Sequence, residues 1–363
     1  MAYEIDFIGS PGVEKDNDAI AFRYYSYQES RYVVCVFDGG TTKVGEMLSN
    51  HLARYYLSPD TINCGIDYVF CSHADSDHSA GLRTILENHK VRHLVMNRPW
   101  LFLEEIYEKV KDGRITKESL EKRLKEQYSF IADLEKIANE RNIPILNGFQ
   151  NTKLEGSLCI CSPSKNSYLD RLSESPKTPE MESSTDSFSS NTIVASEKIQ
   201  SRWGDDAIRE DVRTSPENET SIVLRISPNG DKPFVLTGDA GCIALKDAMD
   251  FADANNLSLN RCSFVQIPHH GGRHNVSPSI LNRLLGPIVP FNTTLGKTAF
   301  VSVGDGSDHP RKSVVNACIH RGCSVYVSRT NTLWHHVGDV PKRNWSSATK
   351  EEYSEDVESW EDE

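Results

Sequence analysis

Short apolar runs alternate with amphipathic segments along most of the chain. Strand-like runs end at an Asp, a His or a Gly in residues 31–40 (RYVVCVFDGG), 66–72 (IDYVFCS) and 234–241 (FVLTGDAG). Apolar residues at helical spacing follow the second run, and residues 91–97 (VRHLVMN) then return as a strand. Such runs, bounded by turn residues and joined by helices, predict the strands of a layered α/β protein.

Most of the polar residues that could bind a metal or take part in catalysis lie at the ends of predicted strands. The first 40 residues predict two strands, and two later strand-like runs lead into the polar segments 265–272 (VQIPHHGG) and 302–310 (SVGDGSDHP). Because functional side chains gather on loops held by a rigid scaffold, strands that all end this way predict one site at a common rim of the sheets.

Two segments interrupt this pattern. Residues 101–142 predict charged amphipathic helices that pack on their own domain; walling a substrate groove or forming a dimer contact are the alternatives. Residues 164–217 contain 12 serines and predict a flexible insertion outside the catalytic core. The expected organisation is one domain over residues 1–335, followed by an extension over residues 336–363.

The composition limits the class of protein. The extension ends in a tail, residues 351–363, with eight acids and no base, which predicts disorder. The nine cysteines form no CxxC pair, which favours a reducing compartment. With no run of about 18 apolar residues and no leader-like start, we expect a soluble cytoplasmic protein with no membrane contact. The formal charge of -12 disfavours a protein that coats nucleic acid but leaves a nuclease open.

The segment His73-Ala74-Asp75-Ser76-Asp77-His78 places four candidate metal ligands in six positions directly after a predicted strand. Imidazole nitrogens and carboxylate oxygens together suit zinc, manganese or iron. A polar loop with two surface histidines is the alternative, but a purely structural loop does not need this crowding.

Six segments, taken together and in order, resemble the metallo-β-lactamase superfamily, and in particular the metallo-β-lactamase domain of the ComEC family of DNA-uptake proteins. They are VFDGG (36–40), SHADSDHSAGL (72–82), NETSIVLRI (218–226), FVLTGDAG (234–241), VQIPHHGG (265–272) and SVGDGSDHP (302–310). The resemblance implies a metallo-β-lactamase fold, an αββα sandwich of two packed mixed sheets with helices outside. HADSDH departs from the usual HxHxDH motif because Asp75 stands where the second His is expected.

The resemblance also implies a cofactor of two divalent metal ions, Zn²⁺ or Mn²⁺. His73 and Asp75 would hold one ion, Asp77 and His78 would hold the second, and Asp239 would bridge them. The usual GHT histidine is missing, and residues 218–221 stand in its region. A more oxygen-rich first position would favour Mn²⁺ over Zn²⁺.

The remaining roles fall on three histidines and two aspartates. We expect His269 to bind metal and His270 or His309 to protonate the leaving group, although the sequence leaves open which of the three touches metal. Asp77 would also accept a proton from the attacking water. Asp38 would hold a metal ligand in place by a hydrogen bond.

The expected function is hydrolysis by a two-metal phosphodiesterase, first of all a nuclease acting on DNA. Soluble relatives of this kind resemble effectors of bacterial defence systems, which implies a protein partner encoded in the same operon. Hydrolysis of a cyclic nucleotide, a lactone or another small ester is the first alternative. A non-catalytic binding module that recruits a partner through its acidic tail is the second.

Overall fold

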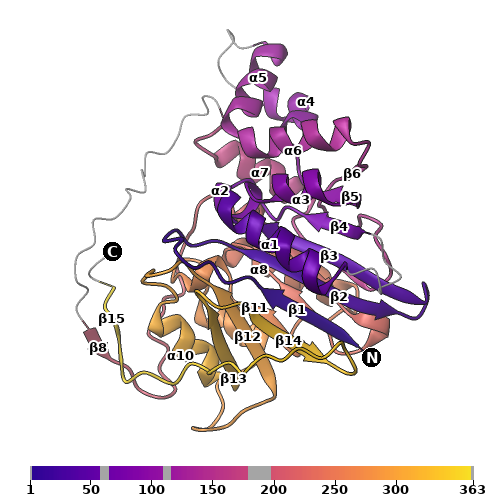
Figure 1. Ribbon diagram of the computed structural model, residues 1–363. Helices are drawn as coiled ribbons and strands as arrows, with labels where there is room; N and C mark the ends of the chain where they lie inside the picture. Colours follow the sequence, from indigo (N-terminus) through magenta and orange to yellow (C-terminus); the bar gives the residue numbers. More distant parts are fainter. Residues whose placement is uncertain (1, 58–64, 109–115, 179–197, 361–363) are drawn as a thin grey trace.

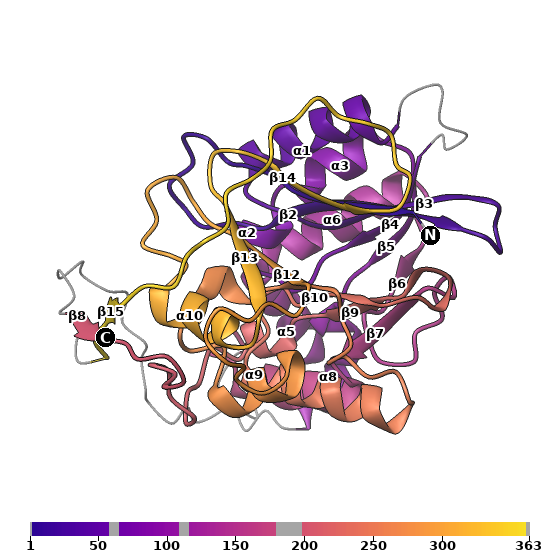
Figure 2. The same cartoon turned by 90° about the horizontal axis from the view of Figure 1, so that it is seen from below.

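The computed structural model describes residues 2–57, 65–108, 116–178 and 198–360. Its two large sheets lie face to face, with helices on the outside of both (Figures 1 and 2). In Figure 2, α1 (Thr42–Tyr55) and α3 (Leu82–Asn88) cover one sheet, whereas α8 (Cys242–Ala254) and α9 (Pro278–Leu285) cover the other. This arrangement confirms the predicted α/β class with an αββα sandwich.

The first sheet has seven strands in the order β14-β1-β2-β3-β4-β5-β6. Its N-terminal strands pair antiparallel, whereas β3, β4, β5 and β6 pair parallel, so the sheet is mixed. The strands are β1 (Tyr3–Phe7), β2 (Ala19–Ser26), β3 (Arg31–Gly39), β4 (Ile66–Phe70), β5 (Val91–Val95), β6 (Ile145–Leu146) and β14 (Leu333–Val337).

The second sheet has six strands in the order β13-β12-β11-β10-β9-β7. It is also mixed, because β10, β11, β12 and β13 pair parallel, whereas β9 pairs antiparallel with both of its neighbours, β10 and β7. The strands are β7 (Leu158–Ser162), β9 (Val223–Ile226), β10 (Phe234–Leu236), β11 (Phe264–Gln266), β12 (Lys297–Ser302) and β13 (Cys323–Ser328).

Three apolar cores hold the layers together. The core between the sheets is rich in aromatic residues, with Phe22 and Phe234 stacked edge to face at 5.6 Å between ring centroids. In β2, Phe22 faces this core and Ala21 faces the core under α1, as the twofold alternation of a strand requires. Because both faces of β2 are buried, its sequence lacks a polar face, and the prediction of two strands in the first 40 residues missed the third.

The predicted helices of residues 101–142 are present in the described part of that range. They are α4 (Leu103–Tyr107), α5 (Lys117–Gln127) and α6 (Ser129–Glu140), preceded by the short 3-10 helix η1 (Pro99–Phe102). Their apolar faces join the core under the first sheet through residues such as Leu124 and Leu134. They therefore pack on their own domain, and they also wall a pocket described below.

The structure differs from the expected flexible insertion over much of residues 164–217. Helix α7 (Lys165–Glu174) begins at Ser164, whose side chain accepts a hydrogen bond from the Ser167 N–H, and it buries Tyr168, Leu169 and Leu172. Residues 179–197 lie outside the described residues. Strand β8 (Lys198–Gln200) follows and pairs with β15 (Asp356–Glu358).

The C-terminal region likewise differs from the expected extension. The expected boundary at 335/336 falls inside β14, which pairs with β1 across its length. Residues 356–358 of the acidic tail form β15, and Val357 is only 1% exposed. Residues 361–363 lie outside the described residues. Helix α10 (Lys312–His320) receives this tail, because Glu358 accepts a hydrogen bond from the Lys312 N–H. In the described part of the chain, no helix has both the length and the apolar character needed to cross a membrane.

Candidate metal centre

The HADSDH segment forms a tight loop that leads from β4 into the short helix α2 (Ser76–Ser79). Gly39 allows the end of β3 to approach the chain that follows this loop. A Cβ atom on Gly39 would lie only 2.4 Å from the Leu82 backbone nitrogen. The preceding Asp38 has a positive φ of 60° and is fully buried, which turns its carboxylate toward the loop. The end of β3 and the start of α3, which follows α2 directly, are therefore held in close contact at one rim of the sheets.

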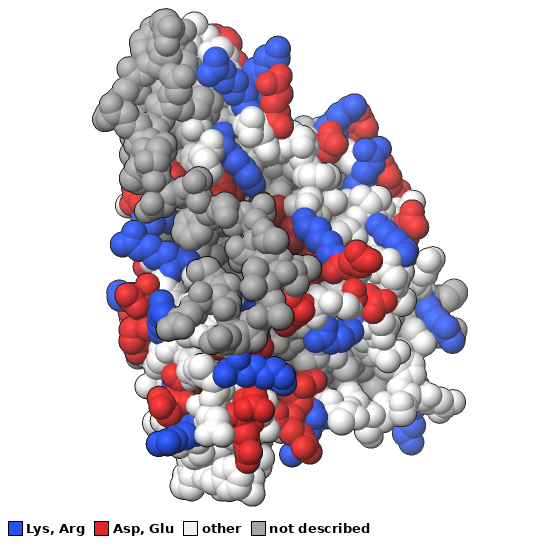
Figure 3. All heavy atoms as spheres, turned by 90° about the vertical axis from the view of Figure 1, so that its left-hand side faces the viewer, with Lys and Arg blue, Asp and Glu red and all other residues white. Residues whose placement is uncertain are grey.

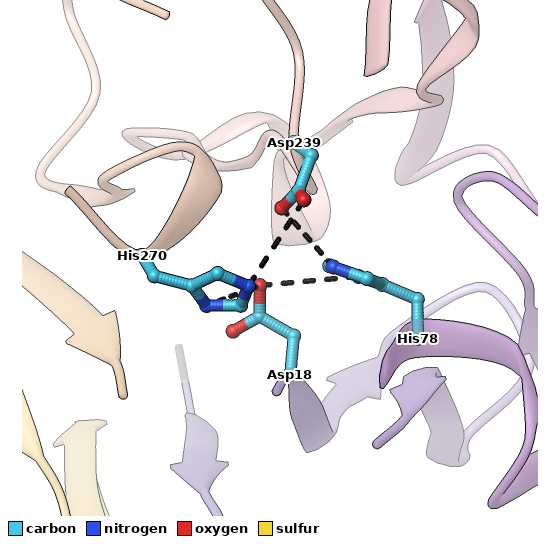
Figure 4. Close-up of side chains that lie close together, drawn as sticks. All are labelled: Asp18, His78, Asp239 and His270. Atoms are coloured by element: carbon cyan, nitrogen blue, oxygen red, sulfur yellow. Dashed lines mark ion pairs between the residues drawn. The ribbon is translucent and has the colours of Figure 1, made fainter. Parts of the chain in front are cut away.

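Four buried side chains converge at this rim, as Figure 4 shows. Asp18, His78, Asp239 and His270 each offer one donor atom, and these four atoms all lie within 4.8 Å of one another. They come from four separate places in the chain: the start of β2, α2, the end of β10 and the loop after β11. Clustered imidazole and carboxylate donors are the set that binds zinc or manganese.

Hydrogen bonds orient the two histidines of this cluster. His78 Nδ1 donates to Asp38 Oδ2 at 2.9 Å, and His270 Nδ1 donates to the carbonyl oxygen of Ser302 at 3.0 Å. In both rings, Nε2 is thus left with a free lone pair directed at the cluster. This pattern of a carboxylate or carbonyl behind each ring is the usual support of a metal-binding histidine.

A second group of side chains lies near Oδ2 of Asp239, the oxygen that His270 Nε2 also approaches at 4.0 Å, whereas His78 Nε2 lies near Oδ1. His269 Nδ1 lies 2.7 Å from Asp239 Oδ2, and His73 Nε2 lies 3.8 Å from the same oxygen and 3.7 Å from Asp75 Oδ2. The opposite nitrogen of His73 is 3.0 Å from the Ser72 hydroxyl. Asp239 therefore lies between two groups of donors, which is the placement expected of a bridging ligand.

The buried donor atoms fit a bound cation. Among the described residues, the Nε2 atoms of His73, His78 and His270 and the Oδ1 atom of Asp239 are buried without a hydrogen-bond partner. His78 Nε2 lies 3.1 Å from Asp239 Oδ1 but is not aligned for a hydrogen bond. Burying an unsatisfied polar atom costs about 1–3 kcal/mol, so several in one place indicate a missing ligand.

The electrostatics of the centre also favour a cation. Burial alone would raise the pKa of Asp239, but the charges of His78, His269 and His270 hold it well below the usual range. Burial alone would lower the pKa of His78, but the charges of Asp239 and Asp38 raise it well above the usual range. The centre therefore concentrates negative charge from Asp239 and Asp38 around His78, which favours a cation there.

Asp18 is a candidate ligand that sequence reasoning missed. Burial raises its pKa to about 6, its Oδ2 accepts from the Gln266 side chain at 2.9 Å, and its Oδ1 has no partner among the described residues. The only available signal was a pair of acids, Asp16 and Asp18, directly before β2. No spacing rule connects that pair to the later motifs, so only the fold reveals the contact.

The remaining predicted site residues lie around this centre. Asp77 is not in the group of four, but its Oδ2 lies 3.9 Å from His270 Nε2. His309 lies farther out, with its ring centroid 6.4 Å from that of His269 and its Nδ1 2.7 Å from Asp16 Oδ2. Its role as a proton donor stays a prediction.

The backbone of the His269–Gly271 segment adopts an unusual conformation. His269 and His270 have positive φ angles of 47° and 54°, which cost energy in residues with side chains. A Cβ atom on Gly271 would lie 2.4 Å from the Pro310 Cβ atom, so the glycine lets the HHGG loop approach the GSDHP loop. Strain of this kind concentrates at functional sites, and here it aims both histidines at Asp239.

Two lysines pair with carboxylates of the HADSDH segment. Lys177 Nζ lies 2.7 Å from Asp75 Oδ1, and Lys15 Nζ lies 3.2 Å from Asp77 Oδ1. Burial alone would raise the pKa of Asp75, but His73 and Lys177 hold it well below the usual range. The insertion that contains Lys177 therefore reaches the candidate site.

A narrow pocket opens beside His73. Helices α6 and α7 wall it through residues such as Ile131, Tyr168 and Arg171, and Glu217 also lines it. The helical insertions thus form one side of the cleft next to the candidate metal centre.

No family model matches the sequence, and no curated protein matches it either. Among solved structures, the chain is similar to unliganded yeast PDE1, at 11% identity over 91% of this chain and 98% of that one, with a TM-score of 0.42. It is also similar to Zn²⁺-bound PqqB from Methylobacterium extorquens, at 12% identity over 92% and 99% of the two chains, with a TM-score of 0.40. For the metallo-β-lactamase SMB-1, the identity is 9% over 77% and 86%, with a TM-score of 0.31. Similarity this distant carries no functional argument, so function is argued from the site.

Proposed function

We propose that the protein is a metal-dependent hydrolase that binds two divalent ions and cleaves phosphodiester bonds. The observation that carries the proposal is the convergence of the unpaired Nε2 atoms of His73, His78 and His270 around Asp239. A purely structural cluster would pair these buried atoms with one another or with the backbone.

The chain's own residues divide into two ligand groups that share Asp239. His78, His270, Asp18 and Asp77 would hold one ion, and His73, Asp75 and His269 would hold the other. Bound there, two divalent ions would supply activation of a water molecule and stabilisation of negative charge on the reacting oxygens. Zn²⁺ and Mn²⁺ are the ions that this mixture of nitrogen and oxygen donors favours.

Proton transfer would fall to residues at the edge of the centre. Asp77 is 16% exposed at its side chain and would accept a proton from the attacking water. His309 is held through Nδ1 by Asp16, which leaves Nε2 as the nitrogen that would protonate the leaving group. Burial alone would raise the pKa of Asp16, but His309 and neighbouring groups hold it well below the usual range, so it remains a charged partner for His309.

DNA is the first substrate that we propose, on the basis of the sequence motifs. We also propose a cytoplasmic location and a protein partner in a defence complex. A small phosphodiester is the second candidate, and two observations favour it. The pocket beside His73 is narrow, and on the described surface seen in Figure 3 Lys and Arg are interspersed with Asp and Glu. A groove that follows a nucleic-acid backbone usually has a continuous basic lining.

The test is hydrolysis by metal-free protein after addition of Zn²⁺, Mn²⁺ or Mg²⁺ in turn. The substrates are linear DNA, plasmid, RNA, a cyclic nucleotide, bis(p-nitrophenyl) phosphate and a lactone. We expect metal-dependent cleavage of at least one phosphodiester. The Asp239→Asn substitution should lower the rate of that cleavage by about 100-fold or more. Cleavage of the lactone alone would replace the phosphodiesterase proposal, and cleavage of nothing by zinc-loaded protein would favour a binding module.

A further inference from the structure

We propose that Lys177 and Lys15 form a phosphate-binding pair that holds the anionic group of the substrate beside the metal centre. This proposal rests on the proposed function, because it concerns the substrate of the same site. The substrate class it names is an organic phosphodiester that carries a negative charge.

Lys177 is held in place by a well-anchored turn. Its own N–H donates to the Ser175 hydroxyl at 3.1 Å, and that hydroxyl in turn donates to Glu217. Ser175 and Thr178, on either side, are 5% and 4% exposed. The ammonium group lies 5.8 Å from the centroid of the Tyr128 ring, which supports the side chain on its way to Asp75. Lys177 is thus a fixed positive charge at the centre.

Lys15 reaches the centre from a different loop. The Asp305 N–H donates to the Val13 carbonyl at 2.7 Å, and the Asp18 N–H donates to the Asp77 carbonyl at 3.1 Å, so the loop is fixed on both sides of Lys15. Lys15 Nζ donates to the Ser76 hydroxyl at 2.9 Å and also faces Asp77. Its side chain is 57% exposed, so a ligand can reach it from solvent.

Both ammonium groups are paired with carboxylates that would bind metal. The lysines face Oδ1 of Asp75 and of Asp77, whereas Oδ2 of each carboxylate faces a histidine of the centre. A divalent ion bound through Oδ2 would offset the negative charge of the carboxylate that each lysine faces. Once metal ions offset the carboxylate charge, the surroundings of each lysine become more positive. Binding of an anion by each lysine then becomes more favourable. An ammonium is a strong point-charge partner for phosphate oxygens.

The pairing therefore predicts that metal and phosphate bind cooperatively. A phosphodiester should bind weakly to metal-free protein, in which Asp75 and Asp77 occupy the lysines. It should bind more tightly to zinc-loaded protein, in which both the ions and the lysines attract it. A merely structural role for the lysines predicts no such dependence on Lys177 or Lys15.

The experiment measures binding of dimethyl phosphate by calorimetry to the zinc-loaded full chain, together with zinc content. We expect Lys177→Met and Lys15→Met each to weaken dimethyl phosphate binding by about tenfold with unchanged zinc content. Lys177→Arg should recover most of the loss because the positive charge is kept. Lys246→Met is the matched control, since Lys246 forms a comparable ion pair with Asp250 at 2.7 Å on the outer helix α8.

Acetate is titrated in parallel as an anion without a phosphate group. If Lys177→Met weakened acetate binding as much as dimethyl phosphate binding, the phosphate assignment would be overturned. Equal affinity of wild type and both Met variants for dimethyl phosphate would overturn the lysine pair. Loss of zinc from Lys177→Met would do the same, because it would show that Lys177 holds Asp75 in place. Failure of the wild type to bind zinc is a different result and would contradict the proposed function itself.

Discussion

At the scale of single residues, the centre depends on groups that hold the ligands as much as on the ligands. Asp38 is the clearest case, because it accepts hydrogen bonds from His78 Nδ1 and from the Ser72 N–H and hydroxyl. Its carboxylate selects the His78 tautomer whose Nε2 lone pair is free. Asp38 thus links the end of β3 to the proposed metal ligand on α2.

Asp38→Asn should weaken zinc affinity by about 10–100-fold, since losing a carboxylate behind a metal-bound histidine has effects of this size. The measurement is zinc affinity by competition with a chromophoric chelator, with circular dichroism as the control for folding. A folded Asp38→Asn protein with wild-type zinc affinity would contradict the role of Asp38.

Individual residues were predictable from sequence where they were crowded into one segment. His73, Asp75, Asp77 and His78 lie in a single loop, so their meeting requires only a turn. Asp18 could not be predicted, because it approaches His78 only through the pairing of β2 with β3.

At the scale of elements, buried ion pairs fasten the segment after β8 to α10. Asp206 accepts from His320 Nδ1 at 2.7 Å and from Arg321 Nη2 at 2.6 Å, with its side chain 4% exposed. Burial alone would raise the pKa of Asp206, but His320 and Arg321 hold it below the usual range. This part of the serine-rich insertion is therefore fixed to the second sheet's outer layer.

Asp206→Asn should lower the free energy of unfolding by about 2–3 kcal/mol at pH 7, because a buried charge loses its partner. The folded pKa lies below the unfolded value of about 3.9, so this stability is present above pH 4 and is lost as pH falls through the folded pKa. Urea unfolding at pH 7 and pH 3 should show the difference between variant and wild type shrinking at the lower pH. A constant difference would contradict the ion-pair account.

The docked tail is the second element-scale feature. The Trp360 ring stacks on Arg273 and Arg209, with guanidinium carbons 4.5 and 4.7 Å from its centroid, and its Nε1 donates to the Ala207 carbonyl. Arg273 follows the HHGG loop directly, so the tail braces the loop that presents His269 and His270.

Trp360→Ala should lower the free energy of unfolding by about 2 kcal/mol through the lost stacking and hydrogen bond. Thermal unfolding monitored by circular dichroism measures it, with Trp360→Phe as a variant that keeps the stacking and should lose less. An unchanged melting temperature in Trp360→Ala would show that the tail does not support the loop.

Helices and strands were predictable where apolar and polar residues alternate with the spacing of that element. The strands around VFDGG and the charged helices show it, whereas β2 is buried on both faces and lacks alternation. Helix α7 was missed because serines dominate the composition around its apolar residues Tyr168, Leu169 and Leu172. Its stability comes from tertiary packing, which composition does not report.

At the scale of the whole molecule, the proposed ions join the two halves of the sandwich. His73, Asp77 and His78 belong to loops of the first sheet, whereas Asp239 and His270 belong to loops of the second. The alternation of strand-like runs and helices predicted a layered α/β fold, and the family resemblance carried by the ordered motifs implied the sandwich. Metal bound at this junction would hold the two sheets together.

Removal of metal should therefore destabilise the whole molecule. A ligand present at 1,000 times its Kd adds about 4 kcal/mol to the free energy of unfolding, so chelation should lower the melting temperature by several degrees. Differential scanning calorimetry of chelated and zinc-reloaded protein measures the shift. Identical melting temperatures would mean that no ion links the sheets.

The central claim is that divalent ions bind between the two histidine groups around Asp239. Anomalous X-ray scattering from crystals of zinc-loaded protein, collected on both sides of the zinc absorption edge, tests it most directly. The account predicts two peaks on either side of Asp239, one about 2.0–2.1 Å from the Nε2 atoms of His78 and His270 and one at a similar distance from His73 Nε2. An anomalous map with no peak among these residues, or with its peaks elsewhere in the molecule, would contradict the account.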